Sequence, residues 1–188
     1  KIAQDRKTQA YNFGYWGDKL YHYLERDLKE QYFGFGERTG KVNKHFRRMK
    51  MQNVDPMGYD AEYSDPLYKH IPFYITRNKE TKYSFGIFYD NTSTVVFEMG
   101  TELDNYHGLY RYFEAEDGDL DYYVIAGPNI GKITERFSWL TGKTIFSPKW
   151  SIGYVPFRPV AMPIPIIPIR PILPGQKINR IWLSVWGL

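Results

Sequence analysis

The sequence predicts a mainly β protein, an antiparallel β-sandwich followed by one helix and an irregular proline-rich tail. Aromatic residues make up 18% of the 188-residue chain, with 17 tyrosines among them, and such residues favour strands over helical bundles. Between residues 71 and 126, short apolar or alternating runs are separated by turns rich in Asp, Asn and Gly. Strands joined by short turns, with no helix between them, indicate an antiparallel sandwich.

The N-terminal third contains strands separated by a long loop. Residues 11–33 mix aromatic and charged side chains, and their spacing fits a short helix and the entry into a strand equally well. Residues 32–37 alternate aromatics with glycines, which predicts a strand with a close backbone approach at glycine. Residues 46–51 form a basic strand candidate, and residues 53–68 are rich in Asp, Pro, Gly and Asn. A loop of that length in a compact domain is usually functional or disordered.

The strand pattern becomes clearer after the loop. We expect strands at 71–76, 83–89, 94–99, 106–114 and 120–126. The turns at 90–93 and 117–119 carry the Asp, Asn and Gly residues typical of hairpins, so each is predicted to join two paired strands.

One helix is predicted over residues 129–141. Ile130, Ile133, Phe137 and Leu140 form a single apolar stripe after Gly127-Pro128-Asn129. The helix is expected to end at Gly142, where glycine can adopt a left-handed cap.

Composition changes abruptly at Val155. Residues 155–188 hold seven of the 12 prolines, no tyrosine and no acidic residue, while carrying Arg158, Arg170, Lys177 and Arg180. The net charge of +4 therefore belongs to this tail, and the body is neutral, which argues against nucleic acid as a partner. Prolines spaced this closely remove strand hydrogen-bond donors, so we expect polyproline II and poor packing.

Several kinds of site are excluded by spacing. The glycines of residues 34–40 do not fit G-x-G-x-x-G, and there is no Walker A sequence, so no cofactor is expected. Asp117, Asp119 and Asp121 resemble the start of an EF-hand loop, but the glycine and glutamate that follow are missing, and no metal is expected. The chain has no cysteine, no signal peptide and no run of 18 apolar residues, which fits a cytoplasmic protein without a membrane partner.

Asp55 is the candidate binding residue, and two interpretations stay open on spacing alone. It opens the long loop in Gln52-Asn53-Val54-Asp55-Pro56. It can bond its own backbone as a turn-former before proline. Alternatively, its carboxylate can accept hydrogen bonds from sugar hydroxyls, since the same loop holds Asp60, Asp65, Tyr59, Tyr63 and Tyr68.

Six segments together resemble glycoside hydrolase family 31, the α-glucosidase/α-xylosidase family, in the family's order. They are FGFGERTG (33–40), NKHFRRMKMQNVDPMGYD (43–60), SDPLYKHIPFYI (64–75), FGIFYDNT (85–92), LDYYVIAGP (120–128) and ITERFSWLTGKTIFSPKWSIGY (133–154). The resemblance implies a galactose mutarotase-like sandwich over residues 1–142, a lead into a (β/α)₈ catalytic barrel over 143–154, and an anomalous tail over 155–188. Out-of-frame translation or a chimeric origin explains the tail better than a genuine extension.

The resemblance also implies a role for Asp55. In family members the aspartate of an N-x-D motif on this loop contacts hydroxyls of an α-linked oligosaccharide or glycoside. The family's nucleophile and general acid lie on the barrel, so no catalytic residue is expected here and the chain alone is expected to be inactive. The alternative is a stand-alone carbohydrate-binding or protein-interaction sandwich.

Overall fold

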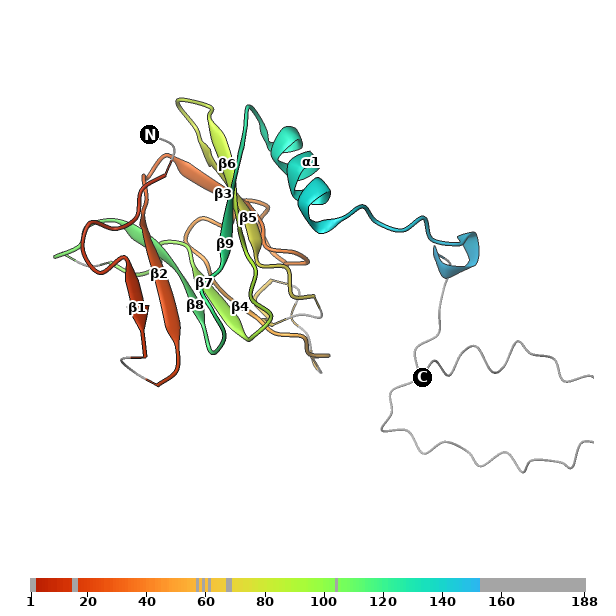
Figure 1. The fold of residues 1–188 in the computed structure, drawn as a ribbon, viewed down its shortest axis with the longest axis horizontal. Coiled ribbons are helices and arrows are strands. Elements are labelled where there is room, and N and C mark those ends of the chain that lie inside the picture. The colour runs from red at the N-terminus through yellow and green to blue at the C-terminus, as the bar shows by residue number, and fades with distance from the viewer. Residues whose placement is uncertain are drawn as a thin grey trace, which may run out of the picture. The chain divides into compact units, whose positions relative to one another are not determined.

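The computed structural model describes residues 3–14, 17–56, 58, 60, 62–66, 69–103 and 105–152. Within these ranges it contains nine strands, one α-helix and one 3₁₀ turn (Figure 1). The strands are β1 (Tyr11–Phe13), β2 (Leu20–Glu25), β3 (Glu30–Gly34), β4 (Arg48–Met51), β5 (Phe73–Asn78), β6 (Ser84–Tyr89), β7 (Val95–Glu98), β8 (Tyr110–Ala115) and β9 (Tyr122–Gly127). The helix is α1 (Ile130–Thr141), and the 3₁₀ turn is η1 (Lys149–Ile152).

The strands form two antiparallel sheets. Sheet A has the order β1-β2-β8-β7-β4, and sheet B has the order β3-β5-β6-β9. Their inner faces enclose an aromatic core, in which Tyr89 stacks on Phe113 with ring centroids 3.9 Å apart. Tyr89 comes from sheet B and Phe113 from sheet A, and both are buried. Burial of each such side chain stabilises the fold by roughly 1.5–3 kcal/mol. Two packed antiparallel sheets confirm the predicted antiparallel sandwich.

Residues 11–33 form three strands, so the helix interpretation of this segment was wrong. Leu20 and Leu24 are both 2% exposed, because a spacing of four satisfies the period of a strand as well as that of a helix. Tyr23 lies in the same strand, pairs with Tyr112 of β8 and is half-buried. Leu28 lies in the turn after β2 and is 61% exposed. The alternating burial of β2 therefore decides for a strand.

Two predicted strand boundaries shift for backbone reasons. β3 ends at Gly34, where φ is +105° and a Cβ atom would lie 2.9 Å from the Phe73 carbonyl oxygen, so the expected close approach at glycine is confirmed. β4 begins at Arg48, two residues later than expected. Phe46 and Arg47 both bond to Met99, and Phe46 has φ +58°, which is a β-bulge at the start of the strand.

The two predicted hairpins are crossovers between the sheets. β6 and β9 belong to sheet B, whereas β7 and β8 belong to sheet A, so neither turn joins paired strands. Asn91, in the first turn, donates through Nδ2 to the carbonyls of Asp117 and Asp119, at 2.9 and 3.3 Å. This buried amide ties the two crossovers together at one end of the sandwich.

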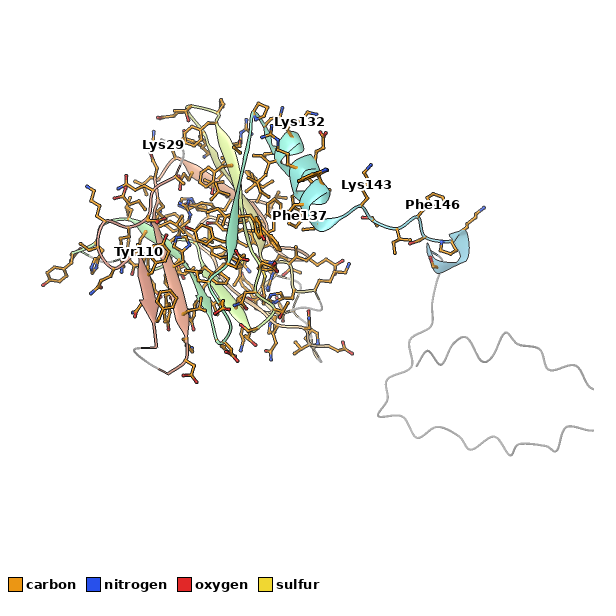
Figure 2. The ribbon with its side chains drawn as sticks, viewed as in Figure 1. Lys29, Tyr110, Lys132, Phe137, Lys143 and Phe146 are labelled. Carbon is orange, nitrogen blue, oxygen red and sulfur yellow. The ribbon has the colours of Figure 1, made fainter. Side chains whose placement is uncertain are left out.

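Helix α1 covers the outer face of sheet B (Figure 1). The Asn129 side chain caps it by accepting a hydrogen bond from the Lys132 amide at 2.9 Å. Ile133 is fully buried, and Phe137 stacks on Phe73 of β5 with centroids 3.9 Å apart. Phe137 lies in the second half of α1 (Figure 2). Gly86 permits this approach, because a Cβ atom there would lie 2.9 Å from Ile133.

The end of α1 differs from the expectation in two ways. Leu140 of the expected stripe is 39% exposed, next to Trp139 at 82%. Gly142 has positive φ, +94°, but its ψ of 157° is extended, so it does not form the left-handed cap. That combination is open almost only to glycine.

The chain divides into two compact units after Thr144. The predicted tail, residues 155–188, lies outside the described residues.

Candidate functional site

The longest connection in the sandwich is the loop between β4 and β5, which carries Asp55. Asp55 is exposed, as are Asn53 and Gly58. Among the described residues, none donates a hydrogen bond to the Asp55 carboxylate and none forms an ion pair with it. Its acceptor oxygens are therefore not engaged in a turn with the described part of the loop.

The other two aspartates of the loop have structural partners. Asp60 Oδ1 accepts hydrogen bonds from the amides of Glu62 and Tyr63, both at 2.9 Å. This is the self-bonding turn geometry that the sequence also allowed for Asp55. Asp65 forms an ion pair with Arg38 and accepts a hydrogen bond from the Lys50 amide.

Further contacts hold the second half of the loop against the sandwich. The Arg47 guanidinium donates twice to the Glu62 carbonyl, at 3.3 and 3.2 Å. The Lys69 ammonium donates to Glu37 at 2.6 Å, and His70 contacts the Asn91 carbonyl at 2.8 Å. Of the tyrosines grouped with Asp55 by sequence, Tyr63 is 71% exposed, and Tyr59 and Tyr68 lie outside the described residues.

A buried ionic cluster joins the two sheets in the interior. Arg111 on β8 donates to Glu30 at 2.7 Å and to the Glu25 carbonyl at 2.9 Å, and also contacts Tyr74 at 3.3 Å. Arg111 is 1% exposed, and Glu30 is 7% exposed. Burial raises the pKa of Tyr32 and Tyr74 beside it, so both hydroxyls remain protonated; Tyr32 donates to Glu30, and Tyr74 accepts from Arg111. Since these groups are closed to solvent, the cluster serves to fix the sheets together.

A second cluster surrounds the buried imidazole of His22. Its Nδ1 lies 2.9 Å from the Tyr89 hydroxyl and its Nε2 lies 3.2 Å from Asp5. Tyr11 stacks on the imidazole with centroids 4.9 Å apart, and its hydroxyl donates to Asp5 at 2.6 Å. Burial is the main cause that lowers the pKa of His22, against the opposing effect of Asp5. The imidazole is fully buried, so it cannot meet a substrate.

The surface beside the long loop is a network of paired charges. An open hollow of about 350 Å³ lies there, lined in part by Lys19, Arg48, Lys50, Asp65 and Glu114. Lys19 and Arg48 both pair with Glu114, at 2.6 and 3.5 Å. Within the described ranges, no three or more His, Asp or Glu side chains converge as metal ligands. No helix in the described part of the chain has the length and apolarity needed to cross a membrane.

Asp55 stays a prediction from the sequence, and sequence reasoning did not single out Arg38, which contacts both ends of this part of the loop. The Arg38 side chain is 4% exposed, and its guanidinium contacts both Asp65 and the Lys50 carbonyl. The turn between Gly36 and Gly40 gives no signal for this contact, because Asp65 lies far along the chain, where spacing carries no information.

Comparisons with known proteins agree with the geometry. The family model for the glycosyl hydrolase 31 N-terminal galactose mutarotase-like domain matches residues 1–98. The chain is 35% identical over 153 residues to Alpha-glucosidase 2 of Bacillus thermoamyloliquefaciens, covering 81% of this chain and 18% of that protein. It is 34% identical over 131 residues to Alpha-xylosidase XylQ of Lactiplantibacillus pentosus, covering 69% of this chain and 15% of that protein.

A solved structure shares the fold. The Flavobacterium johnsoniae GH31 dextranase complexed with glucose is 34% identical and superimposes with a TM-score of 0.67, covering 80% of this chain and 17% of that chain. The chain thus spans less than a fifth of the length of these relatives. Since the family model matches more than half of its residues, the chain belongs to the family of glycosyl hydrolase 31 N-terminal galactose mutarotase-like domains.

Proposed function

We propose that this chain supplies the N-terminal sandwich and one wall of the substrate cleft in a retaining α-glycosidase. Asp55 accepts hydrogen bonds there from hydroxyl groups of an α-linked oligosaccharide or glycoside. The observation that carries the proposal is the difference among the three loop aspartates. Asp60 and Asp65 hold the loop, whereas the exposed Asp55 carboxylate has no partner among the described residues.

The chemistry belongs to a partner domain. Retaining glycosidases use two carboxylates, one as nucleophile and one as acid and base. In this proposal both come from a (β/α)₈ barrel that follows the sandwich, and residues 143–154 lead into it from the domain formed by residues 1–142. The names of the relatives, which include α-glucosidases, an α-xylosidase and a dextranase, support an α-linked substrate. We expect this role to need no cofactor.

A chimera tests the assignment of Asp55. Residues 1–152 replace the matching N-terminal region of Alpha-glucosidase 2 of Bacillus thermoamyloliquefaciens, and hydrolysis of an aryl α-glucoside is measured. A hydrogen bond to a charged acceptor contributes about 1.5–3 kcal/mol. We therefore expect Asp55→Asn to lower kcat/KM by roughly tenfold to a hundredfold.

Asp60→Asn is the matched control. It removes one negative charge from the same loop, while its amide oxygen can still accept from the Glu62 and Tyr63 amides. We expect it to leave kcat/KM within about twofold, as for a residue without substrate contact. Equal kinetics for both variants contradict the proposal. The same substitution at the aligned position of the unmodified relative gives a second measurement that does not depend on the folding of the chimera.

A further inference from the structure

Strand β4, at the edge of sheet A, runs directly into the loop that carries Asp55. Hydrogen-bonded residues alternate along an antiparallel pair. Arg47 accepts a hydrogen bond from the Met99 amide at 2.9 Å, and Lys50 lies opposite Val96. By that alternation, the N–H and C=O of Lys50 point away from β7, toward the free edge of the sheet.

Two side chains occupy the free edge at Lys50. The Asp65 carboxylate accepts a hydrogen bond from the Lys50 amide, and the Arg38 guanidinium donates to the Lys50 carbonyl. Arg38 and Asp65 also form an ion pair with each other. The pair thus stands where a neighbouring strand would supply a carbonyl and an amide. We call it the Arg38–Asp65 clamp.

Arg38 is itself held firmly by the turn on which it lies. Its side chain is 4% exposed, whereas that of Asp65 is 24% exposed. The buried Lys44 ammonium donates to the Thr39 carbonyl at 2.6 Å and reaches the Arg38 carbonyl at 3.5 Å. The clamp therefore connects a well-fixed turn to both arms of the loop, because Lys50 precedes Asp55 on the outgoing arm and Asp65 lies on the returning arm.

We propose that Arg38 and Asp65 are positioning residues, which fix the place where the loop leaves β4 and so orient Asp55 toward the substrate. The inference rests on the proposed function, because it concerns the carboxylate that meets the substrate there. Small displacements matter for such a group: a misplacement of about 1 Å can lower a rate a hundredfold. The clamp contacts Lys50 directly and Asp55 only through the chain.

Hydrogen exchange of the 188-residue chain tests the clamp without any assay of activity. We expect Arg38→Lys and Asp65→Ala, which removes the acceptor of the Lys50 amide, to raise the exchange rate of that amide by at least about tenfold, through local opening. Arg38→Lys keeps the charge, but one ammonium cannot replace the two-pronged guanidinium. Glu37→Gln is the matched control, because it breaks the Lys69–Glu37 pair between the same two segments, whose side chains are 58% and 52% exposed. Exposed ion pairs contribute little to stability, so the control should leave the exchange rate of the Lys50 amide unchanged.

Kinetics of the chimera test the positioning role. We expect Arg38→Lys alone to lower kcat/KM by roughly tenfold, with the melting temperature retained to within a few degrees. In the Arg38→Lys background, Asp55→Asn should lower kcat/KM by less than about threefold, compared with tenfold or more beside Arg38. A residue with a purely structural role would not change the effect of Asp55→Asn.

The outcomes separate the two proposals. If Asp55→Asn has the same large effect in both backgrounds, Arg38 does not position Asp55. If the Lys50 amide exchanges at the same rate in both clamp variants as in the unmodified chain, the clamp does not hold the loop and the inference is overturned. If Asp55→Asn is silent beside Arg38, the proposed function fails, and faster Lys50 exchange in the variants still supports the clamp.

Discussion

His22 lies in the interior of the sandwich, where it links both sheets and the N-terminal segment. Its contacts to Tyr89 and Asp5 suit a neutral imidazole, in which Nε2–H donates to Asp5 and Nδ1 accepts from the Tyr89 hydroxyl. Burial lowers the pKa of His22, the hydrogen bond and the charge of Asp5 oppose this, and the charge of Arg111 adds to the lowering. Tyr11 and Tyr122 complete the surroundings of the ring.

We expect this histidine to make folding stability depend on pH. In the unfolded chain His22 takes up a proton near its ordinary pKa of about 6.5, whereas the folded state resists protonation until a lower pH. The unfolded state then binds more protons, so stability is complete above about pH 6.5 and falls as the pH drops toward the folded pKa. The slope is at most about 1.4 kcal/mol per pH unit.

Urea unfolding of the unmodified chain and of His22→Gln, between pH 7.5 and 5, measures this effect. The variant should be less stable at pH 7.5 but should lose the part of the pH dependence that His22 supplies. Parallel curves for the two proteins across this range would show that His22 does not titrate on unfolding.

Arg111 gives a second prediction for a single residue. Arg111→Met leaves the buried Glu30 carboxylate without its cation, which destabilises a protein by about 3–5 kcal/mol. Adding Glu30→Gln removes that unpaired charge, so the double variant should recover more than half of the loss in a urea titration. If the double variant is as unstable as the sum of both single variants, the pair does not act as a unit.

At this scale the sequence predicted part of the candidate site. Asp55 could be proposed, because Asn-x-Asp-Pro opens a long polar loop. Arg38 could not, because its partner Asp65 is brought to it only by the fold. The different hydrogen-bonding partners of Asp55, Asp60 and Asp65 could not be predicted either, because the composition of a loop does not tell which carboxylate bonds to the backbone.

The elements themselves were largely predictable, and their pairing was not. Runs that favour strands were found at β5 to β9, since apolar alternation and turn residues act locally. Whether the next strand stays in the sheet or crosses to the other depends on distant contacts. Asn91 is the example: its side chain joins two turns that are separate in sequence, and turn chemistry alone gave hairpins at both.

The packing of α1 on sheet B gives a prediction at the scale of a single element. Gly86→Ala places a Cβ atom 2.8 Å from Phe73 and 2.9 Å from Ile133, so the helix has to move away from the sheet. Overpacking of this kind typically destabilises by about 1–3 kcal/mol. The loss is read by thermal unfolding, together with the exchange of α1 amides.

Gly131→Ala is the control within the same helix. A Cβ atom there meets only the Asn129 side chain, at 3.5 Å. Alanine is a better helix former than glycine, so we expect this variant to be stabilised by roughly 0.5–1 kcal/mol. If Gly86→Ala lowers stability and Gly131→Ala raises it, the close packing of α1 on sheet B is supported. If Gly86→Ala leaves stability unchanged, that packing is contradicted.

For the whole molecule we expect no turnover of glycosides by the isolated chain. Glycoside cleavage needs two positioned carboxylates, and this proposal places both on the barrel. The purified 188-residue chain should therefore release no product from an aryl α-glucoside above the blank rate. Turnover that is abolished by a substitution within the chain would show that it carries its own catalytic pair.

Residues 155–188 give the other prediction at this scale. Their prolines remove strand donors, and their four cations have no acidic neighbours in the sequence. We expect amides of this tail to exchange within the dead time of the measurement, while amides of β5 and β6 are protected. A chain that ends at Tyr154 should melt within about 2 °C of the complete chain, and a larger drop would place the tail against the sandwich.

The Arg38–Asp65 clamp also affects how this protein behaves at high concentration. An edge strand with free amides and carbonyls recruits strands from other molecules and seeds aggregates. At Lys50 the outward amide and carbonyl of β4 are already occupied by a carboxylate and a guanidinium. An incoming strand would have to displace a mostly buried arginine before it could pair at Lys50, so we expect the clamp to hinder association through this edge.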